Sequence, residues 1–263
     1  QAGEKISMVT CYDYTSAALV DRSDIDCILV GDSLAMTMHG FNSTVPATVE
    51  MMAMHTAAVA RGAKDKFIVA DLPFLAYRKD LGENIAAVQA VMQAGAHAVK
   101  IEGDAGNTDL VRHLTESGVP VMGHIGLTPQ AVNTFGGYRV QGRGEDGERI
   151  RRDALAVAEA GAFAVVLEKV PEVLARAITQ DVAIPTIGIG ASPACDGQIL
   201  VVDDMLGLFG GFRPKFVKRY AELGEAASAA IATYAQEVGE RRFPAAEHVF
   251  GDAPATVRGG EAA

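Results

Sequence analysis

Four acidic side chains stand at or just beyond the ends of short apolar runs in this sequence. They are Asp32, Asp71, Glu102 and Glu168. If the runs are parallel strands of one barrel, their carboxyl ends meet at one rim, and the four carboxylates converge there. Unpaired carboxylates repel one another and are costly to desolvate, and a divalent cation resolves that conflict. All-oxygen ligands suit Mg²⁺, with water or substrate filling the remaining positions of the octahedron.

Two of these acids have an alternative interpretation. An aspartate at a strand end often caps the helix that follows, and Asp32 or Asp71 taken alone could do so. Because both occur at the ends of adjacent runs, the pair favours a metal site at the rim of a barrel.

Lys100 and Glu102 are two residues apart on one run, so on a strand their side chains face the same way. They form either a structural ion pair or a functional pair, in which Lys100 binds a substrate carboxylate and Glu102 supports the metal. His124 ends the next run. It is either a buried histidine with satisfied hydrogen bonds or a hydrogen-bonding partner of a reacting oxygen.

Short apolar runs alternate with longer amphipathic stretches along the chain. The runs expected as strands are 7–10, 27–30, 67–70, 98–101, 119–122, 163–167, 185–189 and 199–202. The stretches expected as helices are 48–62, 84–94, 108–117, 149–160, 171–179 and, after the last strand, 215–240. Short uninterrupted runs are typical of parallel strands covered by helices. Eight of them favour a single α/β domain, a (β/α)8 TIM barrel with C-terminal closing helices, over an open doubly wound sheet.

The length of 263 residues fits one such barrel. We expect residues 1–250 to form the catalytic barrel domain and the small, polar tail 251–263 to be disordered. Residues 33–47 are expected to form a long loop after the second strand, and loops of that length are often lids or binding loops.

An internal repeat supports the barrel. Residues 94–102 read AGAHAVKIE and residues 160–168 read AGAFAVVLE. Each copy predicts a helix end, a glycine turn, a strand and a terminal glutamate. Ala-Gly-Ala is also a common joint between a helix and a strand. The two glutamates carry more information, because alternate strands of a barrel contribute to the same interior layer, which would place Glu102 and Glu168 at a similar height.

Composition excludes some classes of partner. The chain has 23 basic and 33 acidic residues and a net charge of −10, which argues against nucleic acid but not against a small anionic substrate. Three cysteines without a CxxC spacing do not make a disulfide framework, and they favour the cytoplasm. The apolar runs are too short to span a bilayer, so no membrane association is expected.

The sequence resembles the ketopantoate hydroxymethyltransferase family. The resemblance lies in short segments that follow one another in order over nearly the whole chain. They are TCYDY (10–14), VGDSL (30–34), STVP (43–46), ADLPF (70–74), VKIEG (99–103), GHIGLTPQ (123–130), FGGY (135–138), VQGR (140–143), IGIGA (187–191), DGQ (196–198) and PKF (214–216).

The resemblance implies roles for single residues. Asp32 and Asp71 correspond to Mg²⁺ ligands, with Glu102 as a further metal residue nearby. Glu168 corresponds to the catalytic base. The substrate-binding residues that it implies are Asp32, Ser33, Asp71, Lys100 and His124.

The resemblance also implies an activity. The family transfers a one-carbon unit from 5,10-methylenetetrahydrofolate to 3-methyl-2-oxobutanoate through a Mg²⁺-stabilised enolate, giving 2-dehydropantoate on the way to pantothenate and coenzyme A. Its members are homo-oligomers in the cytoplasm, commonly decamers.

Three other functions compete with this one. A Mg²⁺-dependent lyase or mutase of the phosphoenolpyruvate mutase and isocitrate lyase type also needs an acidic rim. A barrel that binds a metabolite without turnover is the second alternative. A phosphate-binding sugar isomerase that uses the glycines at 188–190 is the third, and the acidic Asp203 and Asp204 after the last strand count against it.

Overall fold

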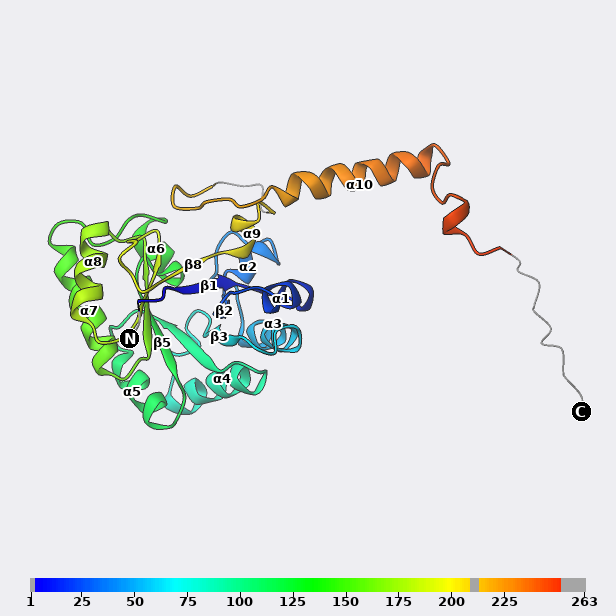
Figure 1. Cartoon of the computed structure of the whole chain (residues 1–263). Helices are drawn as coiled ribbons and strands as arrows, with labels where there is room; N and C mark the ends of the chain where they lie inside the picture. The colour runs from blue at the N-terminus through cyan, green and yellow to red at the C-terminus, as the bar shows by residue number, and fades with distance from the viewer. Residues whose placement is uncertain (1–2, 209–212, 252–263) are drawn as a thin grey trace, which may run out of the picture.

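The computed structural model describes residues 3–208 and 213–251. Eight parallel strands pair in sequence order, and β1 pairs with β8 to close a barrel (Figure 1). The strands are β1 (Ile6–Thr10), β2 (Cys27–Val30), β3 (Phe67–Asp71), β4 (Ala98–Glu102), β5 (Val121–Gly126), β6 (Ala164–Glu168), β7 (Thr186–Ile189) and β8 (Gly197–Leu200). The predicted (β/α)8 barrel is therefore confirmed, and the open sheet is excluded.

Helices surround the barrel (Figure 1). They are α1 (Tyr14–Asp21), α2 (Leu34–Thr37), α3 (Val49–Gly62), α4 (Leu81–Gln93), α5 (Thr108–Glu116), α6 (Val132–Phe135), α7 (Asp146–Glu159), α8 (Glu172–Asp181), α9 (Val202–Met205) and α10 (Leu223–Gly239), with 3-10 turns η1 (Pro129–Ala131) and η2 (Ala246–His248). Thr48 caps the start of α3, because its Oγ1 accepts a hydrogen bond from Met51 N at 3.2 Å.

Alternation along the strands divides the core into two layers. Side chains such as Met8, Leu29 and Val166 fill the interior of the barrel. The intervening residues, such as Val9 and Val165, pack outward in a larger cluster beneath the helices. The polar side chains of the site continue the inward series at the carboxyl ends of the strands.

Two strands differ from their predicted bounds by two residues or more. The β5 strand begins at Val121 and runs on to Gly126, four residues beyond the apolar run that predicted it. A Cβ on Gly123 would lie 2.4 Å from Val157 of α7, so glycine lets that helix approach the strand. The β8 strand begins at Gly197, whose missing side chain makes room for Ile6 and Ile187. His124 consequently lies within β5 and not at its end.

The C-terminal helix is present, but it does not close the barrel as predicted. Helix α10 projects away from the barrel (orange in Figure 1) and buries none of its residues. Ile231, Tyr234 and Val238 are 68, 57 and 46 % exposed on it. The strands close by their own hydrogen bonding, so the barrel does not need this helix. Among the described residues its apolar side chains remain largely exposed, although the ring of Tyr234 contacts that of Phe243.

The loop predicted at 33–47 begins with the short helix α2. From residue 252 onward, the predicted disordered tail lies outside the described residues. Within the described residues, no helix is both long and apolar enough to cross a membrane.

Candidate active site

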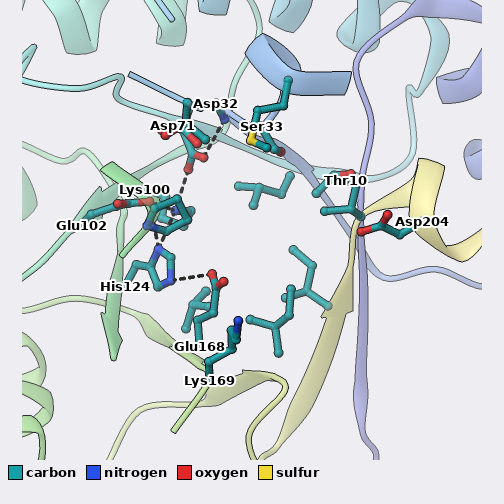
Figure 2. Close-up of a pocket in the computed structure, with 18 of the residues that line it drawn as sticks. Thr10, Asp32, Ser33, Asp71, Lys100, Glu102, His124, Glu168, Lys169 and Asp204 are labelled. Carbon is teal, nitrogen blue, oxygen red and sulfur yellow. Dashed lines mark hydrogen bonds and ion pairs between the residues drawn. The ribbon is translucent and has the colours of Figure 1, made fainter. Parts of the chain in front are cut away.

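The predicted site residues converge at the carboxyl-terminal mouth of the barrel around a cavity of about 400 Å³ (Figure 2). Asp32 and Ser33 follow β2, and the others come from the four following strands. The cavity lining includes Asp32, Ser33, Asp71, Lys100, Glu102, His124 and Glu168. Every residue that the sequence singled out for chemistry therefore borders one cavity.

The registers of the strands explain why these side chains meet. Asp71 pairs with Lys100, Glu102 pairs with His124, and His124 pairs with Val166. In an eight-stranded barrel of shear eight, residues at the same height along the barrel axis are not the hydrogen-bonded partners. From each strand to the next, the residue at the same height lies about one position beyond the paired residue. Glu168 lies two residues beyond Val166 and two strands beyond Glu102, so the two glutamates share a layer, as the repeat predicted.

Lys100 is the cation at the centre of the acidic side chains. Its Nζ lies 3.0 Å from Asp71 Oδ1 and 3.6 Å from Glu102 Oε1, and its side chain is 4 % exposed. Burial lowers the pKa of Lys100, but Asp71, Glu102 and Asp32 outweigh burial and raise the pKa above its usual range. Lys100 is therefore a permanent positive charge at the floor of the cavity.

His124 lies between the two glutamates of the repeat. Its Nδ1 is 3.1 Å from Glu102 Oε1, and its Nε2 is 3.3 Å from Glu168 Oε2 (Figure 2). Burial and Lys100 lower the pKa of His124, but Glu102 and Glu168 outweigh them and raise the pKa to about 9. The interior-histidine interpretation is thus correct in part, since His124 is buried and bonded, but it also faces the cavity.

Asp32 and Asp71 form a second acidic pair. Asp71 Oδ2 accepts a hydrogen bond from the backbone N of Asp32 at 2.9 Å. Neither aspartate caps a helix, because Ser33 is the N-cap of α2 and Asp80 is that of α4. Burial, followed by repulsion from Glu102 and Asp71, raises the pKa of Asp32 well above its ordinary value. Burial also raises the pKa of Asp71, against the opposing effect of Lys100.

Burial and the neighbouring carboxylates raise the pKa values of both Asp32 and Asp71, so an added cation would stabilise the ionised aspartates. Asp71 Oδ1 is buried, and the Lys100 ammonium lies 3.0 Å from it. A Mg²⁺ ion fits such a pair, because it commonly takes one or two carboxylates and completes its shell with water and substrate oxygens.

Glu102 is arranged differently from the two aspartates. One of its oxygens faces His124 and Lys100, and the other accepts a hydrogen bond from Gln130 N at 3.0 Å. Across the described parts of the chain, no three acidic, histidine or cysteine side chains are grouped as a metal site. A direct metal contact for Glu102 therefore stays a prediction, and a contact through water is compatible with its bonds.

Ser33 lies at the upper edge of the cavity. Its Oγ is 2.7 Å from the hydroxyl of Tyr12, which is buried. This contact holds the start of α2 against β1 and fixes the direction of the Ser33 side chain. Its role as a substrate-binding residue stays a prediction.

Several residues of the site were missed by the sequence analysis. Lys169 has a left-handed backbone (φ 46°), and its Nζ donates to Tyr138 O at 2.6 Å, so both residues line the cavity. Gln130 and Tyr77 are buried behind the carboxylates. An apolar part of the cavity lining consists of Leu29, Val166, Ile189, Ile199 and Val201. Gln130 and Tyr138 lie in the segments GHIGLTPQ and FGGY, which carry the family resemblance, but the sequence analysis assigned them no role because only the tertiary fold brings them to the site.

A closed parallel barrel with acidic and basic groups at its carboxyl-terminal mouth defines an enzyme of the (β/α)8 class. Solved structures agree on the fold. A putative phosphonomutase from Burkholderia cenocepacia J2315 has a TM-score of 0.59 at 15 % identity and covers 92 % of this chain and 94 % of its own. A 2,3-dimethylmalate lyase has a TM-score of 0.60 at 17 % identity, with coverage of 95 and 85 %.

Sequence comparison is more specific. The family model for ketopantoate hydroxymethyltransferase matches residues 1–246. A 3-methyl-2-oxobutanoate hydroxymethyltransferase of Chelativorans sp. (strain BNC1) is 60 % identical over 98 % of this chain and 92 % of its own. One from Bdellovibrio bacteriovorus is 58 % identical over 94 % of each. The chain belongs to the ketopantoate hydroxymethyltransferase family.

Proposed function

We propose that this enzyme transfers a hydroxymethyl group from 5,10-methylenetetrahydrofolate to 3-methyl-2-oxobutanoate and releases 2-dehydropantoate. Family membership supports the reaction. The observation that carries it is the placement of Glu168, a proton acceptor, on the same cavity as Lys100 and the apolar part of the lining. A 2-oxo acid with a branched alkyl group matches these features of the cavity, because it has a carboxylate, a carbonyl group and two methyl groups.

The substrate's polar end is proposed to lie against Lys100, Ser33 and the two aspartates. Lys100 supplies a charge for the carboxylate, because its own pKa stays raised in spite of burial. The methyl groups would then lie on the apolar part of the lining, which includes Val166 and Ile199. This orientation directs C3 of the substrate toward Glu168.

Mg²⁺ is proposed at Asp32 and Asp71, where the pKa values and the buried Oδ1 of Asp71 favour an added cation. When bound there, it would supply a Lewis acid for the 2-oxo group. Lys100 would add positive charge on the same side, and together these charges stabilise negative charge that develops on the substrate oxygen.

Glu168 is proposed to accept the proton from C3, which leaves the substrate as an enolate. His124 Nε2 lies 3.3 Å from Glu168 Oε2, so a protonated imidazole would attract this carboxylate and hold it in place. The enolate carbon then forms a bond to the methylene carbon of the folate as the first of its two carbon–nitrogen bonds breaks. Water supplies the oxygen of the new hydroxymethyl group as the second carbon–nitrogen bond breaks. Tetrahydrofolate leaves with both nitrogens protonated, one by the proton that Glu168 had accepted and one by the remaining proton of water.

The test is an incubation of the full chain with 3-methyl-2-oxobutanoate, Mg²⁺ and folate labelled with ¹³C at the methylene carbon. We expect the label in the hydroxymethyl group of the product, and we expect chelator to abolish the reaction. A lyase or mutase of the phosphoenolpyruvate mutase type would instead convert an oxo acid without taking up label. That outcome would replace this proposal.

A further inference from the structure

Gln130 lies in the turn η1 after β5, and it is 5 % exposed. Its side-chain Nε2 donates to Asp32 Oδ2 at 2.8 Å and to the backbone oxygen of Leu72 at 2.9 Å. Its Oε1 accepts from the hydroxyl of Tyr77 at 2.7 Å. Both amide hydrogens and the amide oxygen are therefore in use.

The chemistry of these neighbours decides the orientation of the amide. The Leu72 carbonyl can only accept a hydrogen bond, so the nitrogen of Gln130 must face it, and the same nitrogen donates to Asp32. The flipped amide would place its oxygen against the carbonyl oxygen of Leu72. The Tyr77 hydroxyl then donates to the remaining oxygen, so the orientation is specified from both sides.

The backbone of the same residue reaches a second carboxylate. Gln130 N donates to Glu102 Oε2 at 3.0 Å, and Tyr77 Oη lies 3.3 Å from the backbone oxygen of Glu102. One residue thus holds Asp32 with its side chain and Glu102 with its main chain. These carboxylates follow β2 and end β4, on either side of β3.

We infer that Gln130 is a positioning residue for the divalent-cation site, and that Tyr77 orients it. The amide occupies Oδ2 of Asp32 and leaves Oδ1 as the oxygen that a cation would take. The bond also limits rotation of the Asp32 carboxylate before the cation binds. Less rotational entropy is then lost when the cation binds. This inference rests on the cation site of the proposed function. Groups that orient metal ligands in this way typically change metal affinity or activity by roughly 10- to 100-fold when they are replaced.

The test uses Gln130→Met, which keeps the length of the side chain but removes both donors and the acceptor. Tyr77→Phe removes only the hydroxyl that orients the amide. Gln89→Met, on the exposed surface of α4, makes the same chemical change far from the site. Mn²⁺ serves as the spectroscopic cation, and its affinity is measured by electron paramagnetic resonance without substrate. Thermal unfolding of each variant is recorded in parallel.

We expect Gln130→Met to weaken Mn²⁺ binding roughly 10- to 100-fold, with a smaller loss in Tyr77→Phe and none in Gln89→Met. Excess cation should restore much of the activity of Gln130→Met, because Asp32 itself is still present. If Gln130→Met unfolds more easily but binds Mn²⁺ as well as the wild type does, Gln130 is only structural and the inference is wrong. If the wild type itself does not bind Mn²⁺, the proposed cation site fails before Gln130 is tested.

Discussion

Glu168→Gln is the variant that tests the proposed chemistry most directly. Glutamine keeps the size of the side chain and an oxygen that can accept from His124 Nε2, now 3.3 Å from Glu168 Oε2. It cannot accept a proton from carbon. We therefore expect the cavity and the binding of the oxo acid to persist while proton transfer from C3 is lost.

The size of the loss follows from the neighbours of Glu168. His124 does not replace it, because the raised pKa of His124, about 9, keeps the imidazole protonated at neutral pH. Both of its nitrogens then carry a proton. Lys100 is held as a cation and is not a base. With no replacement beside it, Glu168→Gln should lose the full factor of a general base, about 10²- to 10⁴-fold.

The assay is exchange of the C3 proton of 3-methyl-2-oxobutanoate in D₂O with Mg²⁺ and without folate, followed by proton NMR. The wild type should exchange without folate, because proton removal comes before carbon–carbon bond formation. Calorimetry with the oxo acid checks that Glu168→Gln still binds. Undiminished exchange in a variant that binds normally would refute the assignment and would point to a base outside this cluster.

Three further predictions concern the cation site, Lys100 and the oligomeric state, the last of which rests on the family resemblance. Asp32→Asn and Asp71→Asn should each weaken Mg²⁺ binding and abolish turnover, and full activity of either variant, or of wild type in excess chelator, would contradict the cation site. Lys100→Met leaves Asp71 and Glu102 buried without their cation, which should lower the free energy of unfolding by about 3–5 kcal/mol. Urea denaturation measures this loss, and added Mg²⁺ should restore part of it. The protein is expected to be a homo-oligomer, with a decamer as the predicted state, and α10 offers exposed apolar side chains for such contacts. Light scattering that gives the 27.5 kDa monomer with full activity would contradict this expectation.

The fold could be predicted because its signals are local. Eight apolar runs and the helices between them are visible in the sequence, and each run gave a strand within a few residues. The errors occur where packing between elements decides. The apolar run that predicted β5 stops at residue 122, but the strand continues through Gly123, whose missing side chain accommodates Val157. The position of α10 was wrong because helical periodicity does not specify what a helix packs against.

The site was predictable in part for the same reason. Lys100 and Glu102 are two apart on one strand, so alternation alone places both side chains inward. The contact of His124 with Glu168 needs the register of β5 and β6, which the sequence does not state. Gln130 reaches Asp32 from 98 residues away along the chain, and only the closed barrel brings them together.

Alternation on β4 also limits how this enzyme can change during evolution. Lys100 and Glu102 point into the cavity, whereas Val99 and Ile101 pack outward beneath the helices. A single-residue insertion or deletion within the strand would exchange the two sets, burying a lysine and a glutamate against α4 and turning aliphatic groups toward the substrate. Length variation should therefore be tolerated in the loops around the mouth of the barrel, while the strands that carry the chemistry can vary only by substitution.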